Sequence, residues 1–95
     1  MGLPEEGVLT PYAEPDGSLF AKIPWYRGIR GKLRLTAARL DASAPSPRIH
    51  IPGGYGSYGF QSTGISFPSA GCWRITGSVD RARLTFVTLV LTPPA

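Results

Sequence analysis

The sequence predicts an all-β protein, specifically an antiparallel β-sandwich of about seven strands. Trp73, Ile75 and Val79 fall at alternating positions of segment 71–79, which is followed by the largely β-branched and apolar segment 83–91. Alternation and composition of this kind are typical of two strands joined in a hairpin. The chain also holds 12 Gly and 10 Pro in 95 residues, and no segment shows helical periodicity. A turn-rich β protein therefore fits better than a helical one.

Further strands are expected earlier in the chain, at residues 18–25, 32–40, 48–51 and 65–67. In the second of these, Leu33 and Leu35 alternate with polar residues, and a bulge is expected at Ala37 and Ala38. The Gly-rich stretch 52–64 is expected to cross between sheets. We expect an acidic leader with at most a short edge strand over residues 1–17, and a single domain over residues 18–95.

Seven segments of the chain carry a family resemblance, and together they span most of its length. They are residues 22–27 (Lys-Ile-Pro-Trp-Tyr-Arg), 31–36, 39–41, 51–56, 59–61, 71–73 and 84–87. These segments resemble the small Ig-like domains of uncharacterised bacterial cell-envelope proteins and lipoproteins. The resemblance implies an extracytoplasmic setting and no catalytic residues. This chain departs from that pattern because residues 1–6 lack the features of an export signal.

The same resemblance implies how the strands divide between two sheets. One sheet would hold strands 18–25, 32–40 and 65–67, and the other would hold strands 48–51, 71–79 and 83–91. Trp73 would then pack between the sheets. In this arrangement the end of strand 48–51 lies beside the start of strand 71–79.

Charge is distributed unevenly along the chain. Four of the six acids lie before residue 18, whereas the remainder carries all ten Lys and Arg against Asp41 and Asp80. A basic body of this kind either binds an anionic partner or serves solubility.

Several chemistries are excluded by residue counts. One Cys forbids an internal disulfide, and one Cys with one His cannot build a structural zinc site. No metal site and no cofactor are therefore predicted. The pattern Gly54-x-Gly56-x-x-Gly59 matches the dinucleotide fingerprint in form, but residues 60–64 cannot begin the helix that this motif requires. No stretch is long and apolar enough for a membrane helix.

The expected sheet arrangement makes the only His and the only Cys cross-strand neighbours. His50 could then take the proton of Cys72, and Arg74 could stabilise the resulting thiolate, which is the minimum needed for ester hydrolysis. Alternatively, Cys72 is a packed small residue and His50 lies on a basic surface. If the pair forms, the protein would be a minimal cysteine hydrolase with Cys72 and His50 as its catalytic residues, which is the alternative to a binding or structural module.

Two other segments supply candidate binding residues. Tyr55 and Tyr58 lie on a glycine-rich loop, a composition shared with antibody binding loops, and either bind a ligand or cap the sandwich. Aromatic and basic residues interleave in a second segment, which suits contacts to phosphate or carboxylate groups. Its candidates are Trp25, Tyr26, Arg27, Arg30 and Lys32, of which Trp25 either meets a partner or closes the hydrophobic core. Arg74, outside this segment, is a further candidate for binding.

The sequence thus favours a small binding or structural module that presents a basic, Tyr- and Gly-rich surface. Its partner would be an anionic polymer, a carbohydrate or a protein, with nucleic acid less favoured. Exposed edge strands, the first and last above all, could also pair between copies to form a homo-oligomer. The ligand, the oligomeric state and the compartment stay open.

Overall fold

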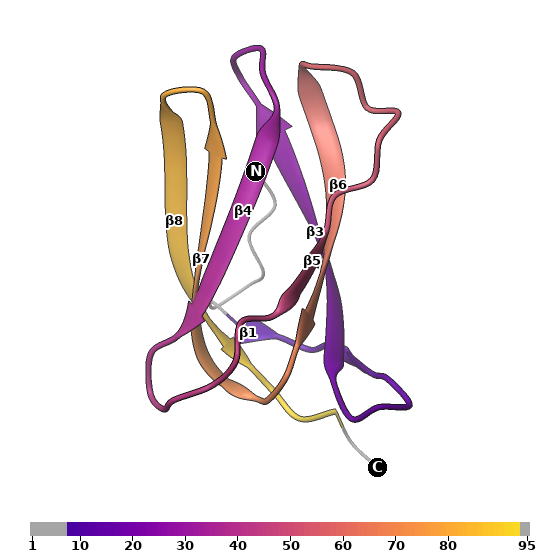
Figure 1. Cartoon of the computed structure of the whole chain (residues 1–95), viewed down its shortest axis with the longest axis vertical. Helices are drawn as coiled ribbons and strands as arrows, with labels where there is room; N and C mark the ends of the chain where they lie inside the picture. Colours follow the sequence, from indigo (N-terminus) through magenta and orange to yellow (C-terminus); the bar gives the residue numbers. More distant parts are fainter. Residues whose placement is uncertain (1–7, 94–95) are drawn as a thin grey trace.

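The computed structural model describes residues 8–93, which form two packed four-stranded β-sheets (Figure 1). One sheet has the order β1-β8-β7-β4 and the other β2-β3-β6-β5, and every pair is antiparallel except β1 with β8. The strands are β1 (Val8–Leu9), β2 (Tyr12–Ala13), β3 (Leu19–Arg27), β4 (Leu33–Arg39), β5 (Arg48–His50), β6 (Gly59–Phe67), β7 (Gly71–Val79) and β8 (Ala82–Val90). The predicted all-β, two-sheet architecture is confirmed.

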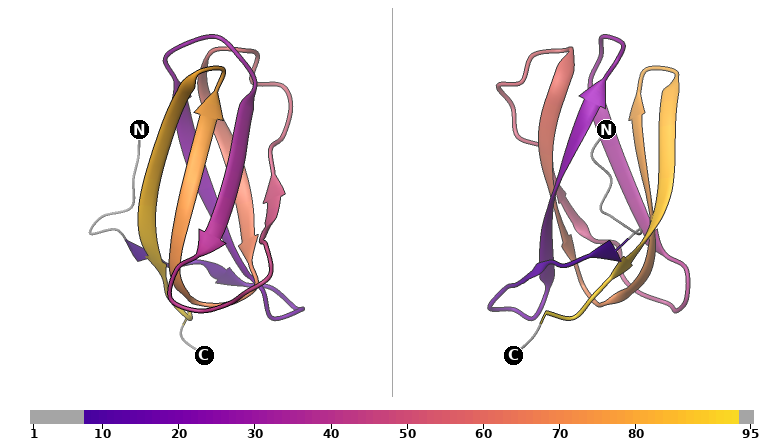
Figure 2. Two further views of the ribbon diagram at one scale, coloured as in Figure 1. Left: turned by 60° about the vertical axis from the view of Figure 1, so that its left-hand side comes forward. Right: turned by 180° about the vertical axis from the view of Figure 1, so that it is seen from behind.

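The core lies between the two sheets, which face each other as layers in Figure 2. Alternation along β3 and β7 turns every second side chain inward, as a strand requires. Trp73 is fully buried at its centre, where its ring lies 5.2 Å from that of Phe67. Trp73 therefore packs between the sheets as predicted, and its indole nitrogen donates a hydrogen bond to the Ser69 carbonyl (3.1 Å).

The β7–β8 hairpin also matches the prediction from alternation. Its strands pair from Gly71 with Val90 to Val79 with Ala82, which leaves a two-residue turn. Asp80 opens this turn with a φ of 52°, a left-handed conformation that Asp adopts more readily than most residues. Both predicted strands therefore form within two residues of their expected bounds.

The predicted division of strands between sheets is wrong in two places. Strand β4 pairs with β7 and not with the strand that precedes it, and β5 pairs with β6 and not with β7. The residues 40–47 that join β4 to β5 cross from one sheet to the other, so β5 joins the far layer. Alternation fixes which face of a strand is buried, but it does not fix which strand lies beside it.

The strand predicted at residues 65–67 is the end of β6, a nine-residue strand between β3 and β5. Its first half escaped prediction because polar residues, Gln61 and Thr63, occupy inward positions. Thr63 is satisfied there, since its hydroxyl donates to the Ile23 carbonyl (2.8 Å) and accepts from the Trp25 indole (3.2 Å). The bulge expected at Ala37 and Ala38 is absent, because β4 pairs with β7 without interruption.

The first two strands are short, and each covers only one end of its neighbour. β1 pairs with Leu89 and Val90, and β2 pairs with Leu19 and Phe20. Among residues 8–93, the rest of β8 and of β3 has a strand on one side only. Pro24 stands in this part of β3, where an edge position tolerates a residue without an N–H group.

The expected leader is described only from residue 8 onward, since residues 1–7 lie outside the described part. Residues 8–17 supply β1, β2 and a turn that Arg48 holds against β5. Arg48 Nη2 lies 3.2 Å from Asp16 Oδ2 and 3.7 Å from Glu14 Oε1. Hydrogen bonds from the Ser18 side chain and main chain, followed by the charge of Arg48, lower the pKa of Asp16. Two of the acids in the predicted leader are thus tied to the body of the protein.

We expect Gly77→Ala to destabilise the fold, because a Cβ at this position would lie 2.5 Å from the Trp25 ring. Overpacking of a filled core typically costs about 1–3 kcal/mol. Urea unfolding monitored by tryptophan fluorescence measures the change. Gly53→Ala is the matched control, since nothing lies within 4 Å of a Cβ there. Equal stability of the two variants would show that Trp25 does not pack on Gly77.

Candidate functional site

One end of the molecule gathers three connections, two of which carry predicted binding residues. These are residues 28–32 between β3 and β4, residues 51–58 between β5 and β6, and the β7–β8 turn (Figure 1). The first two are joined directly, because the Gly31 amide donates a hydrogen bond to the Ser57 carbonyl (2.9 Å). The main chains of these two connections are therefore fixed against each other.

Arg27 is the residue that organises this end, and it is buried with 2% of its surface exposed. Its side chain donates to the main-chain oxygens of Gly31 (3.3 Å), Tyr55 (2.9 Å), Gly56 (2.8 Å), Tyr58 (3.2 Å) and Gly59 (3.1 Å). These five bonds use all five N–H donors of a guanidinium. Arg27 was predicted as a contact to a partner, and this prediction is wrong because the side chain points into the protein and is fully engaged.

The glycine-rich loop owes its shape to this contact. Gly54, Gly56 and Gly59 have φ values of 89°, 66° and 81°, a region that glycine enters without steric cost. The positive φ angles turn successive carbonyl groups toward Arg27, which then holds them in place. Tyr55 and Tyr58 are consequently carried on a loop whose main chain is fixed at four points.

Three exposed aromatic side chains meet beside this loop and form what we call the aromatic ledge: Tyr26, Tyr58 and Phe60. Their exposed fractions are 48%, 48% and 65%. Tyr26 and Phe60 are cross-strand partners whose rings lie 5.0 Å apart, edge to face, and the Tyr26 and Tyr58 rings lie 6.2 Å apart in the same manner. Mutual edge-to-face packing holds each ring in one orientation while leaving ring surface open to solvent.

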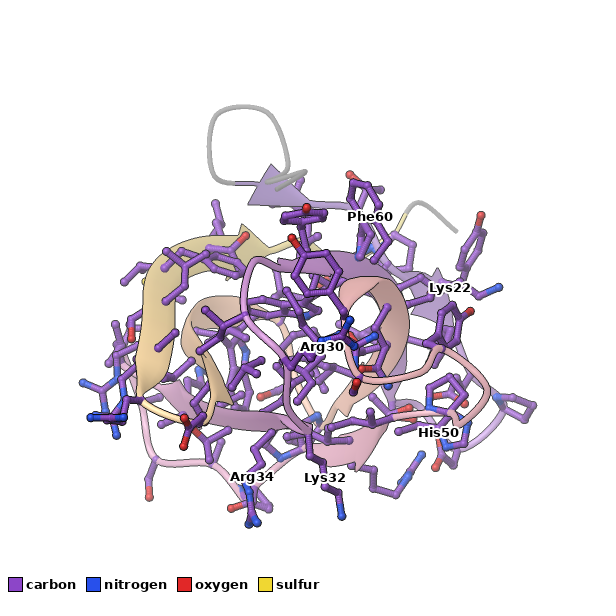
Figure 3. All side chains as sticks on the ribbon, turned by 90° about the horizontal axis from the view of Figure 1, so that it is seen from above. Lys22, Arg30, Lys32, Arg34, His50 and Phe60 are labelled. Atoms are coloured by element: carbon purple, nitrogen blue, oxygen red, sulfur yellow. The ribbon has the colours of Figure 1, made fainter. Side chains whose placement is uncertain are left out.

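Polar contacts tie the ledge to its surroundings. The Tyr26 and Tyr58 hydroxyls lie 3.4 Å apart, and this hydrogen bond raises the pKa of Tyr26 above its usual value. Arg30, which lies over the end of the sandwich in Figure 3, stacks on the Tyr58 ring with its guanidinium carbon 5.7 Å from the ring centre. Tyr26, Tyr58 and Arg30 were all predicted as binding residues, and the structure brings them together.

The remaining predicted binding residues lie elsewhere. Trp25 is 3% exposed and belongs to the core, which is the second of the two roles expected for it. Lys32 lines a cleft of about 360 Å³ on the other side of the glycine-rich loop. Tyr55 projects from that loop toward the outer face of β5 and β6, where it lines a separate groove. Tyr55 and Tyr58 therefore serve different surfaces.

Arg74 lies on the outer face of the β1-β8-β7-β4 sheet, with two other arginines. Register places Arg34, Ser78 and Arg83 in one row, Thr36, Thr76 and Thr85 in the next, and Ala38, Arg74 and Val87 in a third. Among residues 8–93, these three arginines have no carboxylate within ion-pair distance. We call this surface the arginine face.

The predicted contact between Cys72 and His50 is not formed as a cross-strand pair. Cys72 pairs with Leu89 in one sheet, and His50 pairs with Gly64 in the other. The main chain of Cys72 instead binds the end of β4, since its carbonyl accepts from the Leu40 amide (2.8 Å) and its amide donates to Asp41 (3.2 Å). The prediction is wrong because it depended on pairing β5 with β7.

Sequence reasoning missed Phe60 because it fell in a stretch predicted as a loop. One signal was present: Phe60 alternates with Gln61 and Thr63 toward the strand that ends at Phe67.

Within the described residues, no group of three His, Cys, Asp or Glu side chains gathers as a metal site. No helix of the length and apolarity needed to cross a membrane occurs there either.

We expect Arg27→Met to lower the free energy of unfolding by about 2–4 kcal/mol, because five carbonyl groups lose a charged donor. The loop over residues 53–58 should also exchange its amide hydrogens faster. Urea unfolding and hydrogen exchange measure the two effects. Arg30→Met is the control, since its exposed contacts contribute little. Similar results for both variants would show that Arg27 does not hold the loop.

We expect the rate at which Cys72 reacts with a thiol reagent at neutral pH to be unchanged in a His50→Ala variant. The two residues lie in different sheets, so the imidazole does not act as base for this thiol. Labelling kinetics across pH give the measurement. A rate that drops severalfold in the variant would restore the hydrolase hypothesis.

Comparison with known proteins adds no assignment to this geometry. No family model matches the sequence, and neither the curated proteins nor the solved structures contain a significant match. The features of the molecule that bear on function are therefore the aromatic ledge, the glycine-rich loop and the distribution of cations.

Proposed function

We propose that this protein is an Ig-like binding module that holds an extended carbohydrate chain against the aromatic ledge. One observation carries the proposal: Tyr26, Tyr58 and Phe60 expose ring surface together in fixed orientations on the same end of one sheet. Clustered exposed aromatic groups are rare on monomers and mark sites of interaction. The outer surface of β3 and β6 extends the ledge along the sheet.

The Ig-like assignment is supported by strand order. In a constant-type Ig domain one sheet has the order A-B-E-D and the other C-F-G. Naming β2 to β8 as A to G gives the same two orders, with β1 added beside the last strand. The β3–β4 and β7–β8 connections then correspond to the B–C and F–G loops, two of the three that bind antigen in antibody variable domains, and the β5–β6 connection corresponds to the D–E loop at the same end.

A carbohydrate suits this surface better than a protein or a nucleic acid. Sugar rings present apolar C–H faces that pack on aromatic rings, and their hydroxyl groups bond to Tyr hydroxyls at the ring edge. Arg30 is the cation that contacts the ledge, and a single cation is too few to follow a phosphate backbone. The ledge and β3 together form an open surface, which admits a chain longer than one sugar.

A second candidate is an anionic polymer bound to the arginine face. Arg34, Arg74 and Arg83 are exposed without carboxylate partners among the described residues, and a row of threonine hydroxyls runs between them. Binding there would weaken steeply with added salt, whereas stacking on the ledge would not. Ionic strength therefore separates the two candidates.

Affinity electrophoresis against a panel of neutral and acidic polysaccharides tests the proposal. We expect retardation in at least one gel, with affinity reduced roughly tenfold in Phe60→Ala and in Tyr26→Ala, equivalent to about 1.4 kcal/mol. Tyr12→Ala is the matched control, because Tyr12 is 75% exposed and lies outside the ledge. Retardation that is absent throughout, or lost equally in the control, would reject carbohydrate binding at the ledge.

A further inference from the structure

A groove of about 250 Å³ lies on the outer face of β3, β6 and β5, next to the aromatic ledge. Lys22, Gly64 and His50 are paired in one row across these strands, so the two basic side chains flank a residue that has no side chain. Figure 3 shows Lys22 and His50 on the same side of the molecule. The space that a side chain on Gly64 would take is occupied by the Phe20 ring, which thus lies between the two basic residues.

The floor of the groove is an aromatic ring. Phe20 lies over Gly64 so closely that a Cβ on the glycine would sit 2.7 Å from a ring carbon. Tyr55 lines the groove from the glycine-rich loop, and Ser62 adds a hydroxyl from β6. Aromatic surface, a hydroxyl group and two basic groups thus converge from four segments, as in sites that orient a small polar ligand.

The lining of the groove carries the positive charge of Lys22 and includes no carboxylate. Within residues 8–93, the side chains of Lys22 and His50 make no ion pair or hydrogen bond. The nearest row along the sheet contains Ser66, which donates to Glu14. Glu14 lies 3.7 Å from Arg48, which also pairs with Asp16, so one cation is shared by two carboxylates outside the groove.

The groove and the ledge share one face and one loop. Tyr26 and Lys22 both point outward on β3, four residues apart, which corresponds to about 13 Å along a strand. The glycine-rich loop sends Tyr58 to the ledge and Tyr55 to the groove. An extended chain that lies on the ledge and runs along β3 therefore passes over the groove.

We propose that this groove binds an acidic sugar unit of the chain held by the ledge, with the sugar ring on Phe20 and Tyr55 and its carboxylate between Lys22 and His50. The inference rests on the proposed carbohydrate function and narrows it to glycans that contain uronic acids. Lys22 supplies a full positive charge, and His50 donates a hydrogen bond to the carboxylate.

Isothermal titration of a galacturonic acid hexamer and its carboxyl-reduced galactose counterpart tests the inference. We expect the wild type to bind the acidic hexamer about tenfold more tightly, because a charge-assisted contact is available only to it. In the double variant Lys22→Gln, His50→Gln the two hexamers should bind equally. Circular dichroism confirms that each variant is folded.

Lys32→Gln is the matched control, since it removes the same charge at the same end but outside the groove. The inference is overturned if the wild type does not prefer the acidic hexamer, if the double variant keeps the preference, or if the control loses it equally. If the ledge does not bind the chain, Phe60→Ala leaves the affinity for both hexamers unchanged, and this result is distinct from the three above. A wild type that binds neither hexamer removes both proposals.

Discussion

A buried guanidinium without a carboxylate partner fixes one end of this molecule. Moving a charge out of water is expensive unless hydrogen bonds replace its hydration. Arg27 meets this demand with five main-chain oxygens drawn from two connections and from the first residue of β6. The candidate site depends on it, because the same contact positions Tyr58 on the ledge and Tyr55 in the groove.

Arginine also ties down the opposite end, though by different means. Arg39 donates to Asp41 (2.8 Å) and to Ser69 (3.1 Å), which joins the β4–β5 connection to the β6–β7 connection. The hydrogen bond from Arg39 lowers the pKa of Asp41, so this tie stays charged in mildly acidic solution. One Cys permits no disulfide within the chain, so core packing and side-chain hydrogen bonds of this kind hold the sheets together.

Alternation in the sequence was enough to predict β3, β4 and β7, because each buries apolar side chains on one face, whereas β8 was predicted from its β-branched and apolar composition. It was not enough for β6, where Thr63 and Gln61 are inward and polar. Strand neighbours could not be predicted either, since pairing depends on how the 40–47 connection crosses between layers. The error that placed Cys72 beside His50 follows from this second limit.

The candidate site was predictable in composition but not in arrangement. Tyr26, Tyr58 and Arg30 were recognised, whereas Phe20, Lys22 and Phe60 were not, because their roles depend on cross-strand neighbours. Arg27 was predicted to contact a partner, although it falls at the same alternate positions of β3 as the inward-pointing Ile23 and Trp25. Arg27 binds only main-chain atoms of the loop over residues 53–58. The exposed side chains of this loop can therefore be substituted while the main chain keeps its path. Such a loop is suited to diversification, and new specificities could be selected on it without rebuilding the framework.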